Sequence, residues 1–185
     1  MCTTTTIVTP GPITAVLFPT PCTRKDYCLA FMIACYLVPI SLVIYNYQSN
    51  PSVSNLICDD TCKNTITYVM VLMGGGAVLY EWERGDPVSM VIIAILLVGI
   101  YGLIRITETD PTHFVFAYLA FAAIMVFMAR HSYLHRNNWV LWSSLGVEIL
   151  ALLVIVAYMN TNNIFLGEIV YILNFAFFYL YLHFL

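Results

Sequence analysis

The chain has 185 residues, of which 61% are hydrophobic and 9% charged, and its mean hydropathy is +0.86. Soluble domains carry roughly 25% charged residues, so a chain this apolar is expected to lie in a membrane. A net charge of −3 with seven scattered Lys and Arg residues excludes the clustered basic face that nucleic-acid binding needs. The composition predicts an integral membrane protein whose first partner is the lipid bilayer, with no nucleic-acid partner.

The N-terminal segment, residues 1–27, differs from the rest of the chain. It lacks the positively charged start of a secretory signal, and four prolines interrupt its threonines: Pro10, Pro12, Pro19 and Pro21. Prolines at this density favour an extended or polyproline-like conformation. We therefore expect two parts, an extended Thr/Pro-rich tail over 1–27 and a membrane bundle over 28–185.

Six later stretches approach the roughly 20 apolar residues that a membrane-spanning helix needs. They are 28–47, 64–82, 88–105, 113–130, 138–159 and 164–185. Connectors as short as NTNN at 160–163 make consecutive helices antiparallel. The sequence predicts an all-α, polytopic, up-down bundle of about six transmembrane helices. Gly74–Gly76, inside the second stretch, would permit either close helix packing or a local break.

Positive charges are distributed unevenly between the two ends of this bundle. Five lie on the side of the tail, namely Arg24, Lys25, Arg84, Arg130 and Arg136, and two, Lys63 and Arg105, lie on the opposite side. Cytoplasmic loops carry the excess of Lys and Arg, so both termini are predicted to be cytoplasmic. Glu81, Glu83 and Asp86 share the tail side but do not count in this rule. Which membrane holds the bundle is left open.

Two cysteines, Cys58 and Cys62, bracket two aspartates in the first exterior loop, SNLICDDTCKNT. Disulfides persist on the oxidising side of a membrane, so a Cys58–Cys62 disulfide is favoured over free thiols or a metal site. Zinc would need four ligands, and this face adds only His113. His131 and His135, four residues apart on the tail side, are interpreted as interfacial histidines. We predict no bound metal or cofactor.

Two glutamates fall inside spanning stretches, Glu148 about halfway along 138–159 and Glu168 about one turn into 164–185. Ionisable groups at such depth are costly and usually face a partner, a cavity or a pathway. Arg105 and His113 are the expected partners of Glu168, whereas Glu148 is expected to bond to Ser or Asn side chains or to backbone. Two interpretations stay open: glutamates that fix helix packing, and glutamates that handle a ligand, a lipid headgroup or a proton.

Two short segments resemble the damage-regulated autophagy modulator (DRAM)-type family of six-helix membrane proteins. They are NPSVSN at 50–55, in the first exterior loop, and THFVFAYLAFAAIMVF at 112–127, with a histidine near the start of the fourth helix. The tail and the CDDTC segment depart from the family pattern. The resemblance implies six helices and a cytoplasmic N-terminus, and it brings no catalytic residues.

The sequence contains no nucleophile–base constellation and no nucleotide loop, which favours a non-enzymatic protein. Its tail and minimal loops favour a structural or accessory subunit that anchors a larger assembly, either an organellar complex or the membrane-proximal shell of a virus, with protein partners. The alternative is a small transporter, lipid-binding protein or proton-coupled carrier that uses Glu148 and Glu168.

Overall fold

The computed structural model describes residues 23–45, 52–57, 60–158 and 164–185. Within these ranges the chain is all-helical and has no strand. The helices are α1 (Arg24–Tyr45), α2 (Val53–Ile57), α3 (Asp60–Arg84), α4 (Pro87–Arg105), α5 (Pro111–Leu134), α6 (Trp139–Tyr158) and α7 (Phe165–His183). Residues 1–22 lie outside the described part, so the prediction of an extended tail stays a prediction.

Each of the six expected stretches overlaps a long helix within the described residues, and the short α2 was not expected. Five of the long helices are long and apolar enough to cross a membrane, namely Arg24–Val43 of α1 and the whole of α4, α5, α6 and α7. These five indicate a multi-pass membrane protein. The sixth, α3, is longer than any of them, but glycines, threonines and Glu81 dilute its apolar residues, and it is not among the candidate spans.

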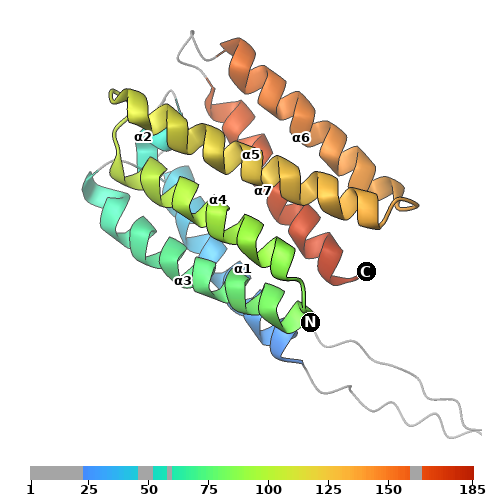
Figure 1. The fold of residues 1–185 in the computed structure, drawn as a ribbon. Helices are drawn as coiled ribbons and strands as arrows, with labels where there is room; N and C mark the ends of the chain where they lie inside the picture. Colours follow the sequence, from blue (N-terminus) through green and yellow to red (C-terminus); the bar gives the residue numbers. More distant parts are fainter. Residues whose placement is uncertain (1–22, 46–51, 58–59, 159–163) are drawn as a thin grey trace, which may run out of the picture.

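The long helices pack in chain order, α1 on α3, α3 on α4, α4 on α5, α5 on α6 and α6 on α7 (Figure 1). Side chains also join α7 back to α1. The Tyr36 hydroxyl donates a hydrogen bond to the Ile172 carbonyl at 3.0 Å, and Asp26 lies 3.1 Å from the His183 ring. The start of α1 and the end of α7 therefore share one end of the bundle, which we call the inner end, and the opposite end is the outer end.

The turn between α3 and α4 follows from three consecutive residues at the inner end. Gly85 has a positive φ of 72°, a conformation that costs glycine little. The Asp86 carboxylate accepts a hydrogen bond from the Ser89 backbone N–H at 3.1 Å, and Pro87 occupies the first turn of α4, as is common at helix N-termini. The turn thus fixes Asp86 at the start of α4, beside α5.

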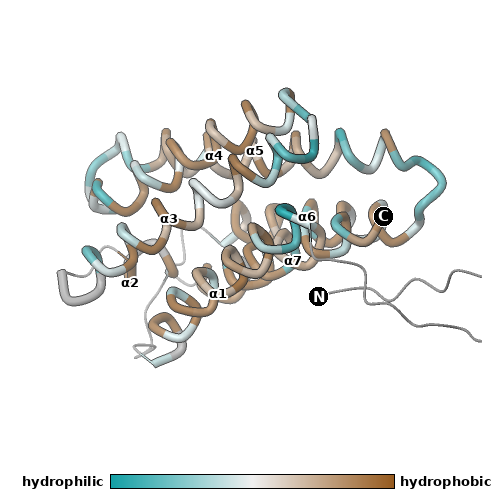
Figure 2. The backbone as a smooth tube through the Cα atoms, turned by 90° about the horizontal axis from the view of Figure 1, so that it is seen from below, coloured by the Kyte–Doolittle hydropathy of each residue, from teal (hydrophilic) through white to brown (hydrophobic). Residues whose placement is uncertain are grey.

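The interior and the outer faces of the bundle are both apolar. Phe127, Met128, Leu141, Tyr171 and Phe178 are all fully buried in the main core of α4 to α7. Large apolar side chains also remain exposed on the outward faces, among them Leu150 and Val115. Figure 2 shows hydrophobic residues along the helices and hydrophilic ones mainly at helix ends and turns. An exposed apolar surface of this kind suits contact with lipid.

The three consecutive glycines of α3 lie where this helix approaches its neighbours. A Cβ atom added at Gly74 would lie 2.6 Å from the Leu97 side chain of α4, and one at Gly76 would lie 3.0 Å from Met32 of α1. The helix continues through all three residues. Of the two alternatives that the sequence left open, the structure shows close packing.

Candidate functional site

At the outer end, Glu168 holds the short helix α2 against α7. Its side chain is buried, and Oε2 accepts a hydrogen bond from the Val53 backbone N–H at 2.6 Å. Val53 is the first residue of α2, so the carboxylate satisfies a donor that a helix start leaves free. Apolar contacts of Val53 and Leu56 with Phe165 and Ile169 reinforce this attachment.

The two expected partners of Glu168 have described contacts elsewhere. The His113 ring is hydrogen-bonded through Nδ1 to the Ile106 carbonyl at 2.7 Å, and the Arg105 guanidinium lies 6.0 Å from the centre of the Tyr101 ring. Each of these contacts joins residues close in sequence near the α4–α5 turn. The structure thus describes a local contact for each of Glu168, Arg105 and His113 at the outer end, and the pairing of Glu168 with Arg105 or His113 stays a prediction.

The predicted disulfide falls at the edge of the described chain. Cys58 lies outside the described residues, and the side chain of Cys62 is not described, so the Cys58–Cys62 bond stays a prediction. Cys28 and Cys35 in α1 are free thiols. The described residues contain no group of three or more His, Cys, Asp or Glu side chains that could hold a metal ion.

Glu148 lies near the middle of α6 and is completely buried. Its Oε2 accepts a hydrogen bond from the Asn174 side-chain amide of α7 at 2.5 Å. Asn174 is itself held by Ser144, whose hydroxyl donates to Oδ1 and whose carbonyl accepts from Nδ2, both at 2.9 Å. Ser144 and Glu148 lie one turn apart on α6, and Asn174 of α7 contacts both. We call these three residues the polar junction between α6 and α7.

The second carboxylate oxygen of Glu148 differs from the first. Oε1 is buried and has no hydrogen-bond partner in the described part of the chain. Tyr36 and Tyr171 are close enough to interact electrostatically with Glu148, but their hydroxyls donate to the carbonyls of Ile172 and Phe121. A buried charge without enough donors is costly, so this environment favours a carboxyl group that carries a proton.

At the inner end, Asp86 and Arg130 form a two-pronged ion pair between α4 and α5. The two nitrogen–oxygen distances are 2.6 and 3.0 Å. The Ser89 hydroxyl donates to Asp86 at 2.9 Å and lies 2.8 Å from Nε2 of the buried His131. Partial burial acts to raise the pKa of Asp86, but hydrogen bonds from Arg130 and Ser89 outweigh it and lower the pKa to about 2.

Glu81 of α3 is a second completely buried carboxylate. Its Oε1 accepts a hydrogen bond from the Tyr179 hydroxyl of α7 at 2.6 Å. Its Oε2 lies 3.8 Å from Nη1 of Arg84, and neither of these two atoms has a hydrogen-bond partner among the described residues. Nη2 of Arg84 lies 3.5 Å from Nδ1 of His131, which connects Glu81 to the Asp86–Arg130 pair.

A third set of contacts links Tyr80 of α3 to the end of α7 and the start of α1. The Tyr80 hydroxyl lies 2.9 Å from Nδ1 of His183, and Nε2 of that ring lies 3.1 Å from Asp26. Polar side chains of α1, α3, α4, α5 and α7 therefore meet at the inner end. We call this set the inner-end network: Asp26, Tyr80, Glu81, Arg84, Asp86, Ser89, Arg130, His131, Tyr179 and His183.

The inner-end network was not predicted from the sequence. From the sequence, the arginines were expected to set the orientation in the membrane and His131 to lie at the interface, whereas His131 is 1% exposed. The sequence does contain one signal that could have predicted the network: acidic and basic residues nearly balance at this end, where Glu81 and Asp86 accompany Arg84 and Arg130. Matched charges near a membrane boundary favour ion pairing within the bundle.

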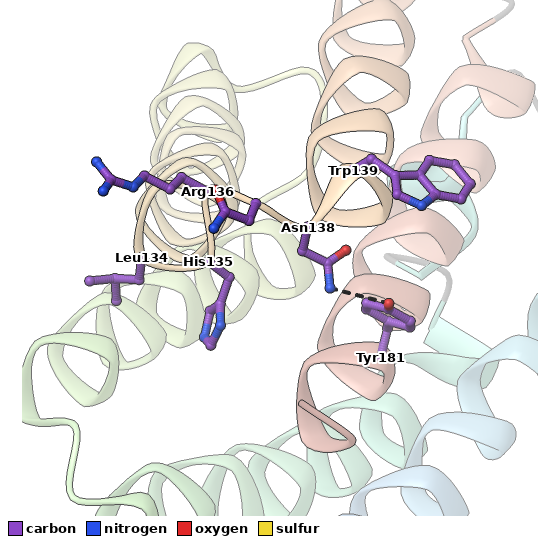
Figure 3. Close-up of a pocket in the computed structure, with 7 residues that line it drawn as sticks. Leu134, His135, Arg136, Asn138, Trp139 and Tyr181 are labelled. Carbon is purple, nitrogen blue, oxygen red and sulfur yellow. Dashed lines mark hydrogen bonds between the residues drawn. The ribbon is translucent and has the colours of Figure 1, made fainter.

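His135 and Arg136 lie apart from the network, at a surface hollow between α5, α6 and α7 (Figure 3). Asn138 closes one side, because its side-chain amide donates to the Tyr181 hydroxyl at 3.2 Å. In Figure 3 His135 and Arg136 point in different directions from the end of α5. The hollow therefore does not bring the His135 ring and the Arg136 guanidinium together.

Comparisons of the chain with family models, curated proteins and solved structures find no match. The resemblance to the DRAM-type family stays a prediction.

Proposed function

We propose that this chain is a non-enzymatic, multi-pass membrane protein that binds and releases a proton at Glu148, as a small proton-coupled carrier does. The observation that carries the proposal is the completely buried Glu148 carboxylate midway along a candidate membrane span, with Oε2 bonded to Asn174 and Oε1 unpartnered among the described residues. Intramembrane carboxylates of this kind mark ion and proton pathways.

The surroundings of Glu148 suit a proton better than a metal cation. Hard cations take six or more oxygen ligands, whereas the polar groups around this carboxylate are already engaged. Asn174 Oδ1 accepts from Ser144, and the Tyr36 and Tyr171 hydroxyls donate to backbone carbonyls. A carboxyl group with one fixed donor and one oxygen without a partner among the described residues offers a site for a single proton.

The experiment is proton flux into vesicles that contain the purified full-length chain, followed with an enclosed pH-sensitive dye under an imposed membrane potential. Glu148→Gln keeps the shape of the side chain and removes its ionisation, so flux should fall to that of empty vesicles. Glu83→Gln is the matched control, because Glu83 is exposed at the inner end and pairs with Arg24 at 3.6 Å. Equal flux in the wild-type chain and Glu148→Gln would reject the proposal.

The second candidate is a structural or accessory subunit that anchors a larger assembly. The inner-end network favours it, because buried ionic contacts that join α1, α3, α4, α5 and α7 suit a rigid scaffold more than a moving carrier. Native electrophoresis of membranes solubilised in mild detergent distinguishes the two. A subunit migrates in a stoichiometric complex with a protein partner and Glu148→Gln leaves that complex intact, whereas a carrier acts without it.

A further inference from the structure

Glu81 and Glu148 share one unusual pattern. Both are completely buried, and in each carboxylate one oxygen accepts a hydrogen bond from a polar side chain of α7, Tyr179 for Glu81 and Asn174 for Glu148. The other oxygen of each is a buried atom without a hydrogen-bond partner in the described ranges. Only Arg84 Nη1, beside Glu81, shares that status there. The two glutamates come from helices far apart in the chain, α3 and α6, and both accept hydrogen bonds from α7.

The two carboxylates lie at different depths. Their α7 partners are five residues apart, which corresponds to about 7.5 Å along a helix axis at about 1.5 Å per residue. Tyr179 is nearer the C-terminal end of α7, so Glu81 is nearer the inner end than Glu148. The order from the middle of the bundle to the inner end is Glu148, then Glu81.

An aromatic layer lies between the two levels. Phe127 and Phe178 are both completely buried, with ring centres 6.4 Å apart. Phe127 also stacks on the Tyr179 ring at 5.5 Å and packs on Phe175 at 5.8 Å. Phe175 and Phe178 lie between Asn174 and Tyr179 along α7, which places these rings between the levels of the two carboxylates.

Glu81, in contrast, adjoins groups that reach the inner surface. Arg84, 3.8 Å from its free oxygen, has a side chain 20% exposed, and the chain of contacts through His131 and Ser89 ends at Asp86. Besides Tyr179 and Arg84, the titratable groups that act on Glu81 are Asp86 and Arg130, and Tyr80 interacts with it as well. The cations lie on the inner side of Glu81, where they can balance a carboxylate.

We propose that Glu81 is the second proton-binding group of this protein and exchanges the proton between Glu148 and the inner end. This inference rests on the proposed function of Glu148. When the aromatic layer parts, an admitted water accepts the proton from the Glu148 carboxylic acid and passes a proton to Oε2 of Glu81. Glu148 is left as a carboxylate that still accepts from Asn174, and Glu81 becomes a neutral acid that still accepts from Tyr179. Release to the inner side restores the Glu81 carboxylate beside Arg84.

The test combines proton flux with chemical labelling in the same vesicles. Dicyclohexylcarbodiimide, a membrane-soluble reagent, adds to the protonated form of buried carboxyl groups, and peptide mass spectrometry locates the adduct. We expect adducts on both Glu81 and Glu148 of the wild-type chain. Glu81→Gln should lower flux by about tenfold or more, as expected for loss of a proton-transfer group, and leave Glu148 labelled. Glu83→Gln should keep wild-type flux.

A conservative variant covers the case in which Glu81→Gln does not fold. Tyr179→Phe removes only the hydroxyl that donates to Glu81, and flux should fall severalfold while Glu148 stays labelled. Loss of flux in Glu148→Gln with wild-type flux in Glu81→Gln or Tyr179→Phe overturns the role of Glu81 and leaves the proposed function standing. An unlabelled Glu81 in the wild-type chain also overturns it. Wild-type flux in Glu148→Gln, or a wild-type chain that passes no protons, overturns both.

Discussion

Glu148 of α6 and Asn174 of α7 are joined by a partly buried 2.5 Å hydrogen bond between two candidate membrane spans. The bond fixes one oxygen of the carboxyl group and leaves the other facing an interior without a described donor. Ser144 holds the amide on its far side. The pair therefore joins α6 to α7, and in the proposed function the same carboxyl group takes up the proton.

The first prediction concerns Asn174 as the connector of this junction. Asn174→Ala leaves Ser144 and Glu148 without their partner, and a buried polar group that loses its partner costs about 1–3 kcal/mol. The unfolding temperature of the protein in detergent should fall accordingly. Asn137→Ala, at an exposed position of the α5–α6 turn, is the control and should leave it unchanged. Equal unfolding temperatures for the two variants would mean that the junction contributes nothing to stability.

The second prediction concerns the pH dependence of the Asp86–Arg130 pair. The folded-state pKa of Asp86 is lowered to about 2, below the value of about 3.9 for an unfolded chain. The stability that this group contributes is therefore fully present above about pH 4, and it is lost as the pH falls toward about 2. The magnitude is on the order of 2 kcal/mol.

Unfolding temperatures measured between about pH 5 and about pH 2 test this dependence. Asp86→Asn should be less stable than the wild-type chain at the upper pH, and the difference should shrink as the pH falls. Glu83→Gln, which alters an exposed carboxylate at the same end, should leave the wild-type profile in place. A constant difference between Asp86→Asn and the wild-type chain over this range would contradict the assigned pairing.

The third prediction concerns the contact of α4 with α5 at Gly99. A Cβ atom there would lie 2.8 Å from the backbone nitrogen of Ala120 and 3.0 Å from its Cα, and backbone atoms cannot move aside as a flexible side chain can. Gly99→Ala should cost about 1–3 kcal/mol, as overpacking of a tight core does. Gly75→Ala meets nothing within 4 Å and should be neutral or slightly stabilising, because alanine favours helix more than glycine does. Equal effects of the two substitutions on the unfolding temperature would contradict the close approach.

The fourth prediction is the disulfide between Cys58 and Cys62. In a sample prepared without reductant, peptide mapping should recover a bridged peptide with these two residues. Cys28 and Cys35, which are free thiols, should be alkylated after denaturation and serve as the internal control. Alkylation of Cys58 and Cys62 under the same conditions would show that the bond is absent.

The sequence was sufficient to predict the long helices, because an apolar run of about 20 residues carries its own signal. The sequence also predicted that α3 spans the membrane, but α3 is not among the candidate spans, because Gly74–Gly76, Tyr80 and Glu81 dilute its apolar residues. The short helix α2 was not predicted. That five-residue helix owes its place to Glu168 and to apolar contacts with α7, residues more than a hundred positions away.

The polar contacts could be predicted only in part. The depth of Glu148 follows from its position in an apolar run, so a buried carboxyl group was expected there. Its bond to Asn174 depends on which face α7 turns toward α6, and the contact of Glu81 with Tyr179 depends on how α3 lies against α7. Such relationships arise from the packing of the whole bundle, and no local pattern in a single sequence specifies them.

The most direct test of the central claim is proton flux into vesicles that hold the wild-type chain, Glu148→Gln or Glu83→Gln at matched protein content. We predict flux with the wild-type chain and with Glu83→Gln, and the background of empty vesicles with Glu148→Gln. Flux that is the same with Glu148→Gln as with the wild-type chain would contradict the claim that Glu148 binds and releases the proton.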